Sequence, residues 1–355
     1  MPEAAGSSSA ALGARRHVTD KAGSPPTGSP LLRLVPATAC LFAVLAIALA
    51  ACPQTAHAGK ADSESAAKAA PHAAAAKPGT AAPTAGFGEV EAAHAADPAL
   101  RQELTRISQE FAATVTAKTL ARFGNKAGHR RLDLLTDPGQ PYRDAVRADA
   151  LAKLREAGAD LSYSQYFVYA DRNPGAQLLL LAFYDAAAER VFLLGADFIS
   201  SGKLRPGEDS FITPLGVFEN LPENWGYRAQ GSKNSKGWRG LGARGSRVWD
   251  FGYQQAPRQF RQGVYDSQMR LLMHATDPDQ GEPRLGGPDS KGCVRVSAAA
   301  NAFIDRHSIL DRHYEQIART DKERDLWLLR PDRAPVSLPG SYLVVGDSAQ
   351  GNAAR

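Results

Sequence analysis

The sequence predicts a mainly β fold with helices at both ends of its folded part, and three observations support this. From Tyr163 onward, short runs rich in β-branched, aromatic and leucine residues are separated by turn residues. Between Asp97 and Gly158, apolar residues recur at helical spacing instead. Near the C-terminus, Ser297 stands at an N-cap position in front of an Ala-rich segment, which indicates a further helix.

An apolar segment close to the N-terminus predicts export. Leu34 to Ala51 is almost uninterruptedly apolar and follows a basic stretch, which is the charge order of a secretory signal. Two processing routes remain open, namely acylation of Cys52 as in a lipoprotein and cleavage after Ala58, with an uncleaved membrane anchor as the third. We therefore expect residues 1–58 to be a signal or lipoprotein-signal region of a periplasmic or cell-envelope protein, lipid-anchored if Cys52 is acylated.

Residues 59–96 are rich in Ala and Pro and hold almost no large apolar residue, so they are predicted to be a disordered linker. Order is expected to begin at Asp97-Pro98, an N-cap followed by proline at the first helical position. The helical extension, residues 97–160, should contain one helix that ends at Gly124 and a second over Gln140 to Glu156.

Residues 161–346 are predicted to form the β-rich domain, and residues 347–355 a tail. The candidate strands are Tyr166–Ala170, Leu178–Tyr184, Arg190–Gly195, Val217–Phe218, Val248–Tyr253, Arg270–His274, Asp325–Leu329 and Tyr342–Val345. Two helices, Ala298–Arg306 and Leu310–Arg319, are expected before the last strands.

Charge and cysteine content narrow the function. The net charge of +5 is too small to indicate a nucleic-acid partner. Two of the three cysteines, Cys40 and Cys52, lie in the export segment or just after it, so Cys293 is the lone thiol of the folded part and a candidate nucleophile. No His, Cys and acidic cluster has the spacing of a zinc site, and we expect no metal and no cofactor.

Three motifs follow one another in the β-rich part. They are Thr213-Pro214-Leu215-Gly216-Val217-Phe218, then His274 after an apolar run, then Ser290-Lys291-Gly292-Cys293-Val294-Arg295. In order and spacing they resemble the signature of the YkuD-type L,D-transpeptidase catalytic domain, over about residues 163–346. The family usually has a second His directly before Gly-Cys, and this chain has Lys291 there. The resemblance implies a β-sandwich with helical N- and C-terminal additions.

Acyl transfer needs a nucleophile, a base and donors for the developing oxyanion. By the resemblance, Cys293 attacks a peptidoglycan stem tetrapeptide to form a thioester, and an amine acceptor resolves it in cell-wall cross-linking or protein attachment. His274 would be the base, held by the carbonyl of Ala275, with Asp277 and Asp289 as alternative orienters. The N–H groups of Lys291, Gly292 and Cys293 would form the oxyanion hole. Ser290 and Arg295 are assigned to substrate binding, with a structural role for Arg295 equally open.

Two other functions remain open at this point. Water in place of the amine would make the protein an L,D-carboxypeptidase or amidase-type hydrolase of peptidoglycan peptides. A wall-binding module without catalysis is the second alternative, and Lys291 is the feature in its favour. The expected partners in every case are peptidoglycan stem peptides, with the membrane added if Cys52 is acylated, and no nucleic acid.

Overall fold

The computed structural model describes residues 86–126, 128, 130–324 and 326–349. The predicted export segment with Cys52 and most of the predicted linker lie outside these residues, as does the end of the predicted tail. The described residues all belong to one compact unit, Pro78–Arg355, which contains the helical segment together with the strands. None of the helices in this described part has the length and apolar character needed to cross a membrane.

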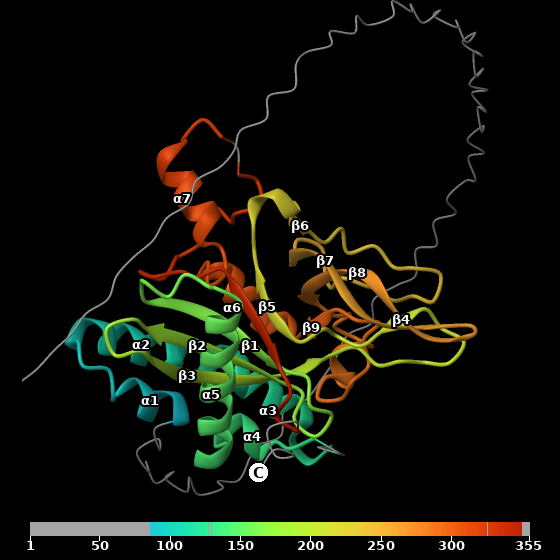
Figure 1. The fold of residues 1–355 in the computed structure, drawn as a ribbon, viewed down its shortest axis with the longest axis horizontal. Helices are drawn as coiled ribbons and strands as arrows, with labels where there is room; N and C mark the ends of the chain where they lie inside the picture. The colour runs from blue at the N-terminus through green and yellow to red at the C-terminus, as the bar shows by residue number, and fades with distance from the viewer. Residues whose placement is uncertain (1–85, 127, 129, 325, 350–355) are drawn as a thin grey trace, which may run out of the picture. The chain divides into compact units, whose positions relative to one another are not determined.

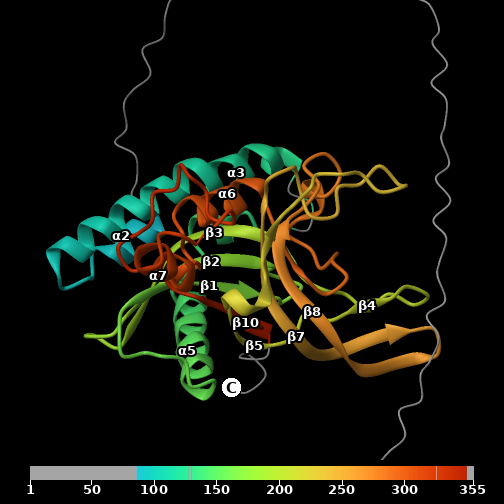
Figure 2. The ribbon, with the colours of Figure 1, turned by 90° about the horizontal axis from the view of Figure 1, so that it is seen from above.

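The strands form one large curled sheet, shown in Figures 1 and 2. Their order across the sheet is β4-β7-β8-β9-β3-β2-β1-β10-β5, with β6 paired to β7. The strands are β1 (Gln165–Asp171), β2 (Leu178–Asp185), β3 (Arg190–Ser200), β4 (Ser210–Phe211), β5 (Gly216–Glu219), β6 (Tyr227–Arg228), β7 (Arg247–Phe260), β8 (Gly263–Ala275), β9 (Val294–Val296) and β10 (Tyr342–Gly346).

Helices precede the sheet and return near its C-terminal end. The α-helices are α1 (Phe87–Ala92), α2 (Pro98–Phe111), α3 (Ala117–Phe123), α4 (Asp133–Thr136), α5 (Gln140–Glu156), α6 (Ala298–Arg306) and α7 (Arg312–Thr320). A π-helical turn, η1 (Ala112–Thr116), joins α2 to α3, and short 3₁₀ turns are η2 (Gly124–Lys126), η3 (Pro222–Asn224) and η4 (Glu282–Arg284). The mixed fold agrees with the predicted β-rich domain flanked by helices.

The central strands are covered on both faces. In Figure 2, α2, α3 and α6 lie along one side of β1, β2 and β3, and α5 lies on the other. The alternating residues of these strands accordingly divide between two hydrophobic clusters, one that includes Phe111 and Phe303 and one that includes Val146 and Leu154. A strand buried on both faces needs an unbroken apolar run, which explains the four leucines at 178–181.

Strand β3 connects this covered layer to the part of the sheet that carries His274. From Arg190 to Phe198 it pairs with β2, with Leu194 at a register shift, whereas Ile199 and Ser200 at its end pair with Val296 and Arg295 of β9. Strand β9 then runs parallel to β8, and β8 forms a long antiparallel hairpin with β7. The short β9 is therefore fixed on both sides, and it follows directly after Cys293.

Several predicted boundaries are corrected by the structure. Order begins before Asp97, because Phe87–Ala92 forms α1 and Gly88 packs so closely on Leu194 that a Cβ would lie 2.0 Å from the carbonyl oxygen of Leu194. The expected strand at 325–329 is wrong, since residues 326–329 form a turn that buries Leu328 and Leu329. Helix α5 has the predicted bounds, and the N-cap Asp97 accepts a hydrogen bond from Ala99 N at 2.8 Å.

Candidate active site

The register of β8 and β9 places His274 and Cys293 on one face of the sheet. Met273 is opposite Val294 and His274 is opposite Arg295, so continuing the register sets Cys293 opposite Leu272. The backbone of Leu272 lowers the pKa of the Cys293 thiol, which agrees with this placement. Strand spacing and rise then put the Cα atoms of His274 and Cys293 about 8 Å apart on adjacent strands, within reach of their side chains.

His274 is held in a defined tautomer. Its ring is buried, and Nδ1 lies 2.7 Å from the carbonyl oxygen of Ala275. Because a carbonyl oxygen only accepts hydrogen bonds, Nδ1 must carry the proton, which leaves the lone pair on Nε2. Burial is the main cause that lowers the pKa of His274, the bond to Ala275 opposes it and the charge of Arg295 adds to it, and the net result is a pKa of about 4. At neutral pH the ring is therefore a neutral base.

Cys293 lies at the end of a loop and is partly exposed. Removal from solvent raises the pKa of its thiol, and the Asp250 carboxylate acts in the same direction. The Leu272 backbone and the Arg295 guanidinium lower the thiol pKa but do not reverse the shift. The resting pair is thus a neutral thiol beside a neutral imidazole, so the proton would move to His274 as the sulfur attacks rather than beforehand.

The loop before Cys293 is shaped by a serine and a glycine. Ser290 Oγ accepts a hydrogen bond from Gly292 N at 3.0 Å and donates one to the Cys293 carbonyl oxygen at 2.6 Å. Gly292 has φ +133°, and a Cβ there would lie 2.8 Å from Cε of Met269, so only glycine fits without strain. The Ser290 hydroxyl is therefore engaged within the loop, and its role in substrate binding stays a prediction. The Gly292 N–H also has a partner, Ser290 Oγ. Of the three N–H groups predicted to form the oxyanion hole, those of Lys291 and Cys293 therefore remain as candidates.

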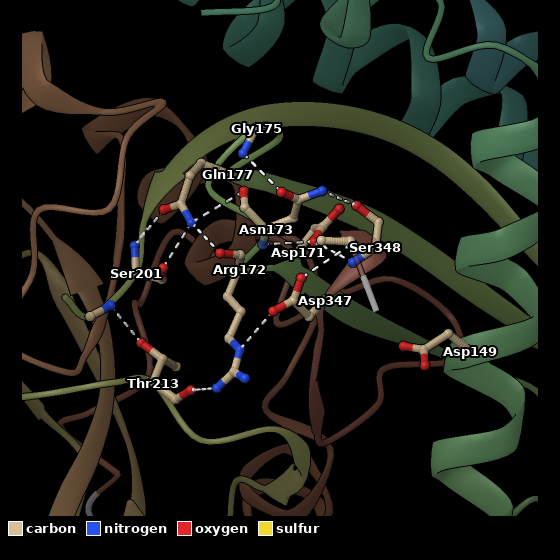
Figure 3. A network of polar contacts seen from close by, with 12 residues as sticks. Asp149, Asp171, Arg172, Asn173, Gly175, Gln177, Ser201, Thr213, Asp347 and Ser348 are labelled. Atoms are coloured by element: carbon tan, nitrogen blue, oxygen red, sulfur yellow. Dashed lines mark hydrogen bonds and ion pairs between the residues drawn. The ribbon is translucent and has the colours of Figure 1, made fainter. Parts of the chain in front are cut away.

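Thr213 of the Thr-Pro-Leu-Gly motif is hydrogen-bonded to this loop. Its hydroxyl accepts from Gly202 N at 2.7 Å and donates to the Gly292 carbonyl oxygen at 2.6 Å. Figure 3 shows how the support continues: Arg172 donates to the Thr213 carbonyl oxygen and pairs with Asp347 at 3.3 Å. The motif is thus architectural, because it ties the Cys293 loop to the ends of β1 and β10.

A second branch of the same network holds the other side of the loop. Gln177 donates to Ser201 Oγ and accepts from Ser201 N, each at 2.8 Å, and both contacts appear in Figure 3. The Ser201 carbonyl oxygen then accepts from Ser290 N at 2.9 Å. Gln177 has a left-handed φ of +49° that this pair of contacts holds in place. The loop is therefore positioned by groups far from it in sequence.

Arg295 belongs to a cluster of arginines around one carboxylate. The Asp289 side chain lies 2.5 Å from Arg205, 3.4 Å from Arg295 and 3.5 Å from Arg284. Trp238 covers two of them, with ring centroid distances of 5.2 Å to Arg284 and 5.8 Å to Arg295. Glu208 lies 3.9 Å from Arg205, so three guanidinium groups face two carboxylates. Positive charge remains in excess, and Arg295 carries it close enough to lower the thiol pKa, which suits an anionic group of a substrate.

The two alternative orienters of His274 have other partners. Asp289 faces the arginine cluster, and Asp277 accepts hydrogen bonds from the backbone N–H groups of Arg239, Asp279 and Gln280. The Ala275 carbonyl is the group that meets His274 Nδ1. Lys291, at the position where the family has His, is exposed and extends to Glu208, with 3.4 Å between Nζ and Oε2.

Two residues near the thiol were not found from the sequence. Asp250 of β7 is buried and paired with Arg270 at 2.6 Å, and it raises the thiol pKa. Burial raises the pKa of the Tyr227 phenol, and the charges of Asp250 and Cys293, which lie nearby, raise it further. Pairing of β6 with β7, and of β7 with β8, brings both residues here, and no local motif marks either of them.

Comparison with known proteins adds no family assignment. No family model matches the sequence, and no curated protein matches it. Within residues 86–349, apart from the three that the structure does not describe, no group of three or more His, Cys, Asp or Glu side chains is placed to hold a metal ion.

Proposed function

We propose that this protein is a cysteine-dependent L,D-transpeptidase of the YkuD type, exported to the cell envelope and acting on peptidoglycan stem peptides. The observation that carries the proposal is the pairing of β8 with β9. It sets Cys293 and His274 on one face, with Nδ1 of His274 bound to the Ala275 carbonyl oxygen and Nε2 left to accept a proton. The β-sandwich of that family, and export with cleavage or acylation, are parts of the proposal.

The first half of the proposed reaction forms a thioester. The sulfur of Cys293 attacks the carbonyl carbon of the third residue of a stem tetrapeptide, and the thiol proton passes to Nε2 of His274. The amide C–N bond then breaks, and His274 returns the proton to the amine of the departing D-alanine. Backbone N–H groups of Lys291 and Cys293 would stabilise the intermediate oxyanion.

The second half transfers the acyl group to an amine. The acceptor nitrogen attacks the thioester carbonyl and gives a proton to His274, after which the C–S bond breaks and the thiolate of Cys293 recovers that proton. Amine and water differ only as the attacking group in this step. The hydrolase alternative therefore shares every residue named here and is separated from a transferase by its product alone.

The test is covalent labelling followed by intact mass. The purified protein is incubated with a carbapenem, whose strained lactam mimics the scissile amide, and we expect one adduct of the whole inhibitor. Cys293→Ala should form none, because the sulfur is the attacking atom. His274→Ala should form it at least about 100-fold more slowly, the scale of a lost general base. His313→Ala serves as the matched control, since His313 lies in α7 and bonds to Glu219.

Absence of an adduct on the wild-type protein would contradict the acylation chemistry and favour a wall-binding module. An adduct that persists in Cys293→Ala would contradict the assignment of the nucleophile. If labelling behaves as expected, a disaccharide tetrapeptide with an added amine acceptor decides the rest. A cross-linked product supports the transpeptidase, whereas a tripeptide alone supports the hydrolase.

A further inference from the structure

Two highly exposed aromatic side chains lie at β7, namely Tyr253 on the strand itself and Trp225 at the end of η3, which contacts the strand. Trp225 is 78% exposed and Tyr253 is 65% exposed, the two largest values among the exposed large apolar side chains of the described residues. Tyr253 is opposite Arg270 in the β7–β8 register, and Asp250 is opposite Leu272. Because side chains alternate along a strand, Arg270, Leu272 and His274 share one face, and Tyr253 shares it with them.

An irregularity in β7 is what puts Tyr253 on this face. The register shifts by one residue between Asp250 and Tyr253, and Gly252 in that bulge has φ +74°. A one-residue shift exchanges the two faces of a strand, so without the bulge Tyr253 would point to the opposite side. The bulge therefore redirects an aromatic ring away from the core side and onto the nucleophile side.

Trp225 is held beside the same bulge in a strained conformation. Its φ of +53° is rare for a bulky residue. Gly226 next to it packs so closely that a Cβ would lie 2.7 Å from Nη1 of Arg247, which fixes the chain against β7. On its other side, the Asn224 carbonyl oxygen accepts a hydrogen bond from Arg270 Nη2 at 2.9 Å.

Arg270 joins the two rings into one arrangement. Its guanidinium lies 5.6 Å from the ring centroid of Tyr253, bonds to the carbonyl of Asn224 next to Trp225, and pairs with Asp250. We call Trp225, Tyr253 and Arg270 the aromatic platform. It is continuous with the candidate active site, because Leu272 separates Arg270 from His274 on the same face, a strand length of roughly 13 Å.

We propose that the aromatic platform binds the sugar rings of a glycan built from N-acetylated hexosamines, and so positions the chain that carries the peptide attacked by Cys293. This inference rests on the proposed function. The face of an aromatic ring is electron-rich and attracts the polarised C–H groups of a pyranose. Beyond the platform on the same face, Gln255 is opposite Gln268, and both amides are exposed to meet hydroxyl and acetamido groups.

A protein partner fits this surface less well. A stable protein interface buries about 800 Å² on each side around a mostly apolar centre. Here the neighbours of the exposed rings are polar: Arg270 lies against Tyr253, Gln255 follows on the same strand face, and Glu223 stands two residues before Trp225 in the chain. Ligands that alternate flat C–H faces with polar groups match such a surface, and saccharides are of that kind.

The test measures binding of chitohexaose, an oligomer of N-acetylglucosamine, to the purified protein by calorimetry. We expect Trp225→Ala and Tyr253→Ala each to weaken binding at least about tenfold, because each removes one stacking ring. Trp327→Ala and Tyr265→Ala are the matched controls. They are 59% and 56% exposed, and Tyr265 lies on the opposite face of β8 near the hairpin tip. These two should bind within about twofold of wild type.

Wild-type protein that does not bind chitohexaose, or binding that both platform variants retain, would overturn the inference. Binding to cell-wall sacculi that is lost when the sacculi are treated with protease would also overturn it, in favour of a wall protein. Carbapenem labelling of the same wild-type preparation separates the two proposals. Glycan binding without an adduct contradicts the proposed reaction alone, and an adduct without glycan binding contradicts the platform alone.

Discussion

The covered layer of β1, β2 and β3 differs sharply from the open layer of β7, β8 and β9. Every residue of β1 and β2 is buried, since helices lie on both sides of them. In the first ten residues of β8, by contrast, burial is confined to Met269 and Leu271 on one face, and the other face reaches solvent. The side chains of the candidate site lie on the open layer, and the covered layer supplies the apolar burial that stabilises the fold.

Strand β3 links the covered layer to the open one. Asp197 of β3 is buried and binds Ser297 Oγ at 2.5 Å and Thr119 Oγ1 at 2.6 Å. Burial raises the pKa of Asp197 to about 6, while the bonds from Ser297 and Thr119 oppose that shift. Ser297 follows β9 directly, so this carboxylate fixes the far end of the short strand whose near end is Cys293.

The largest expected effect on stability comes from opening a cavity in the covered layer. Leu180→Ala removes a fully buried side chain of β2 that packs in the cluster beneath α5. We expect the free energy of unfolding to fall by about 2–5 kcal/mol. Val264→Ala, at a half-exposed position of β8, should change it by no more than about 0.5 kcal/mol. Urea denaturation measures both, and equal effects would contradict the contrast between the layers.

A smaller effect is expected from the support that links the layers. Thr213→Val keeps the side-chain shape but removes the hydroxyl that joins Gly202 N to the Gly292 carbonyl oxygen. Two buried polar groups lose their partner, so stability should fall by about 1–3 kcal/mol. Displacement of the Cys293 loop should slow carbapenem acylation at least about tenfold, since attack depends on geometry.

The control for this variant is Thr114→Val. Thr114 also donates to a backbone oxygen, that of Glu110 at 2.7 Å, but it is exposed on the π-helical turn η1. Acylation by this control should stay within about twofold of wild type. If Thr213→Val acylates at the wild-type rate while it loses stability, the threonine supports the fold alone and does not position the thiol.

The pH dependence of acylation tests the burial of His274. Its pKa is lowered to about 4, so the neutral base persists as the pH falls and is lost only around pH 4. The acylation rate at pH 5.5 should therefore remain within about 10% of its value at pH 7. A histidine with the ordinary pKa of about 6.5 would lose roughly nine-tenths of its neutral form by pH 5.5. Single-turnover labelling at several pH values, with circular dichroism to follow folding, distinguishes the two profiles.

The sequence predicted local elements better than long-range pairings. A helix was predicted over about Gln140 to Glu156 and is found at those bounds, because its apolar spacing is clear and Gly158 follows it. Strands β7 and β8 were predicted as Val248–Tyr253 and Arg270–His274, yet they extend to 14 and 13 residues. Their outer halves are polar and rich in Gln, so only pairing with each other makes them strands.

For the candidate site, the sequence identified the two residues to which we assign the chemistry and missed their surroundings. Cys293 and His274 were found by motif and spacing, and the predicted contact of His274 with the Ala275 carbonyl is present at 2.7 Å. Strand β9 was missed, because a run of three residues is too short to show the alternation of apolar and polar residues that marks a strand. Asp250 could not be placed either, since the β7–β8 register with its bulge is a property of the pairing.

The smallest effect is expected at Lys291, the residue where the chain departs from the signature of the family that it resembles. Lys291 extends into solvent with its side chain 58% exposed, and its partner Glu208 is also largely exposed at 48%. An ion pair of this kind contributes little, and a side chain that leaves the site changes neither the thiol nor the base. The backbone N–H of residue 291 is retained whatever its side chain. Lys291→His, which restores the family residue, should therefore acylate with a carbapenem within about twofold of wild type in an intact-mass time course. A tenfold or larger increase in the acylation rate would contradict this expectation. It would show that a histidine at position 291 takes part in the reaction and that His274 is not sufficient as the base.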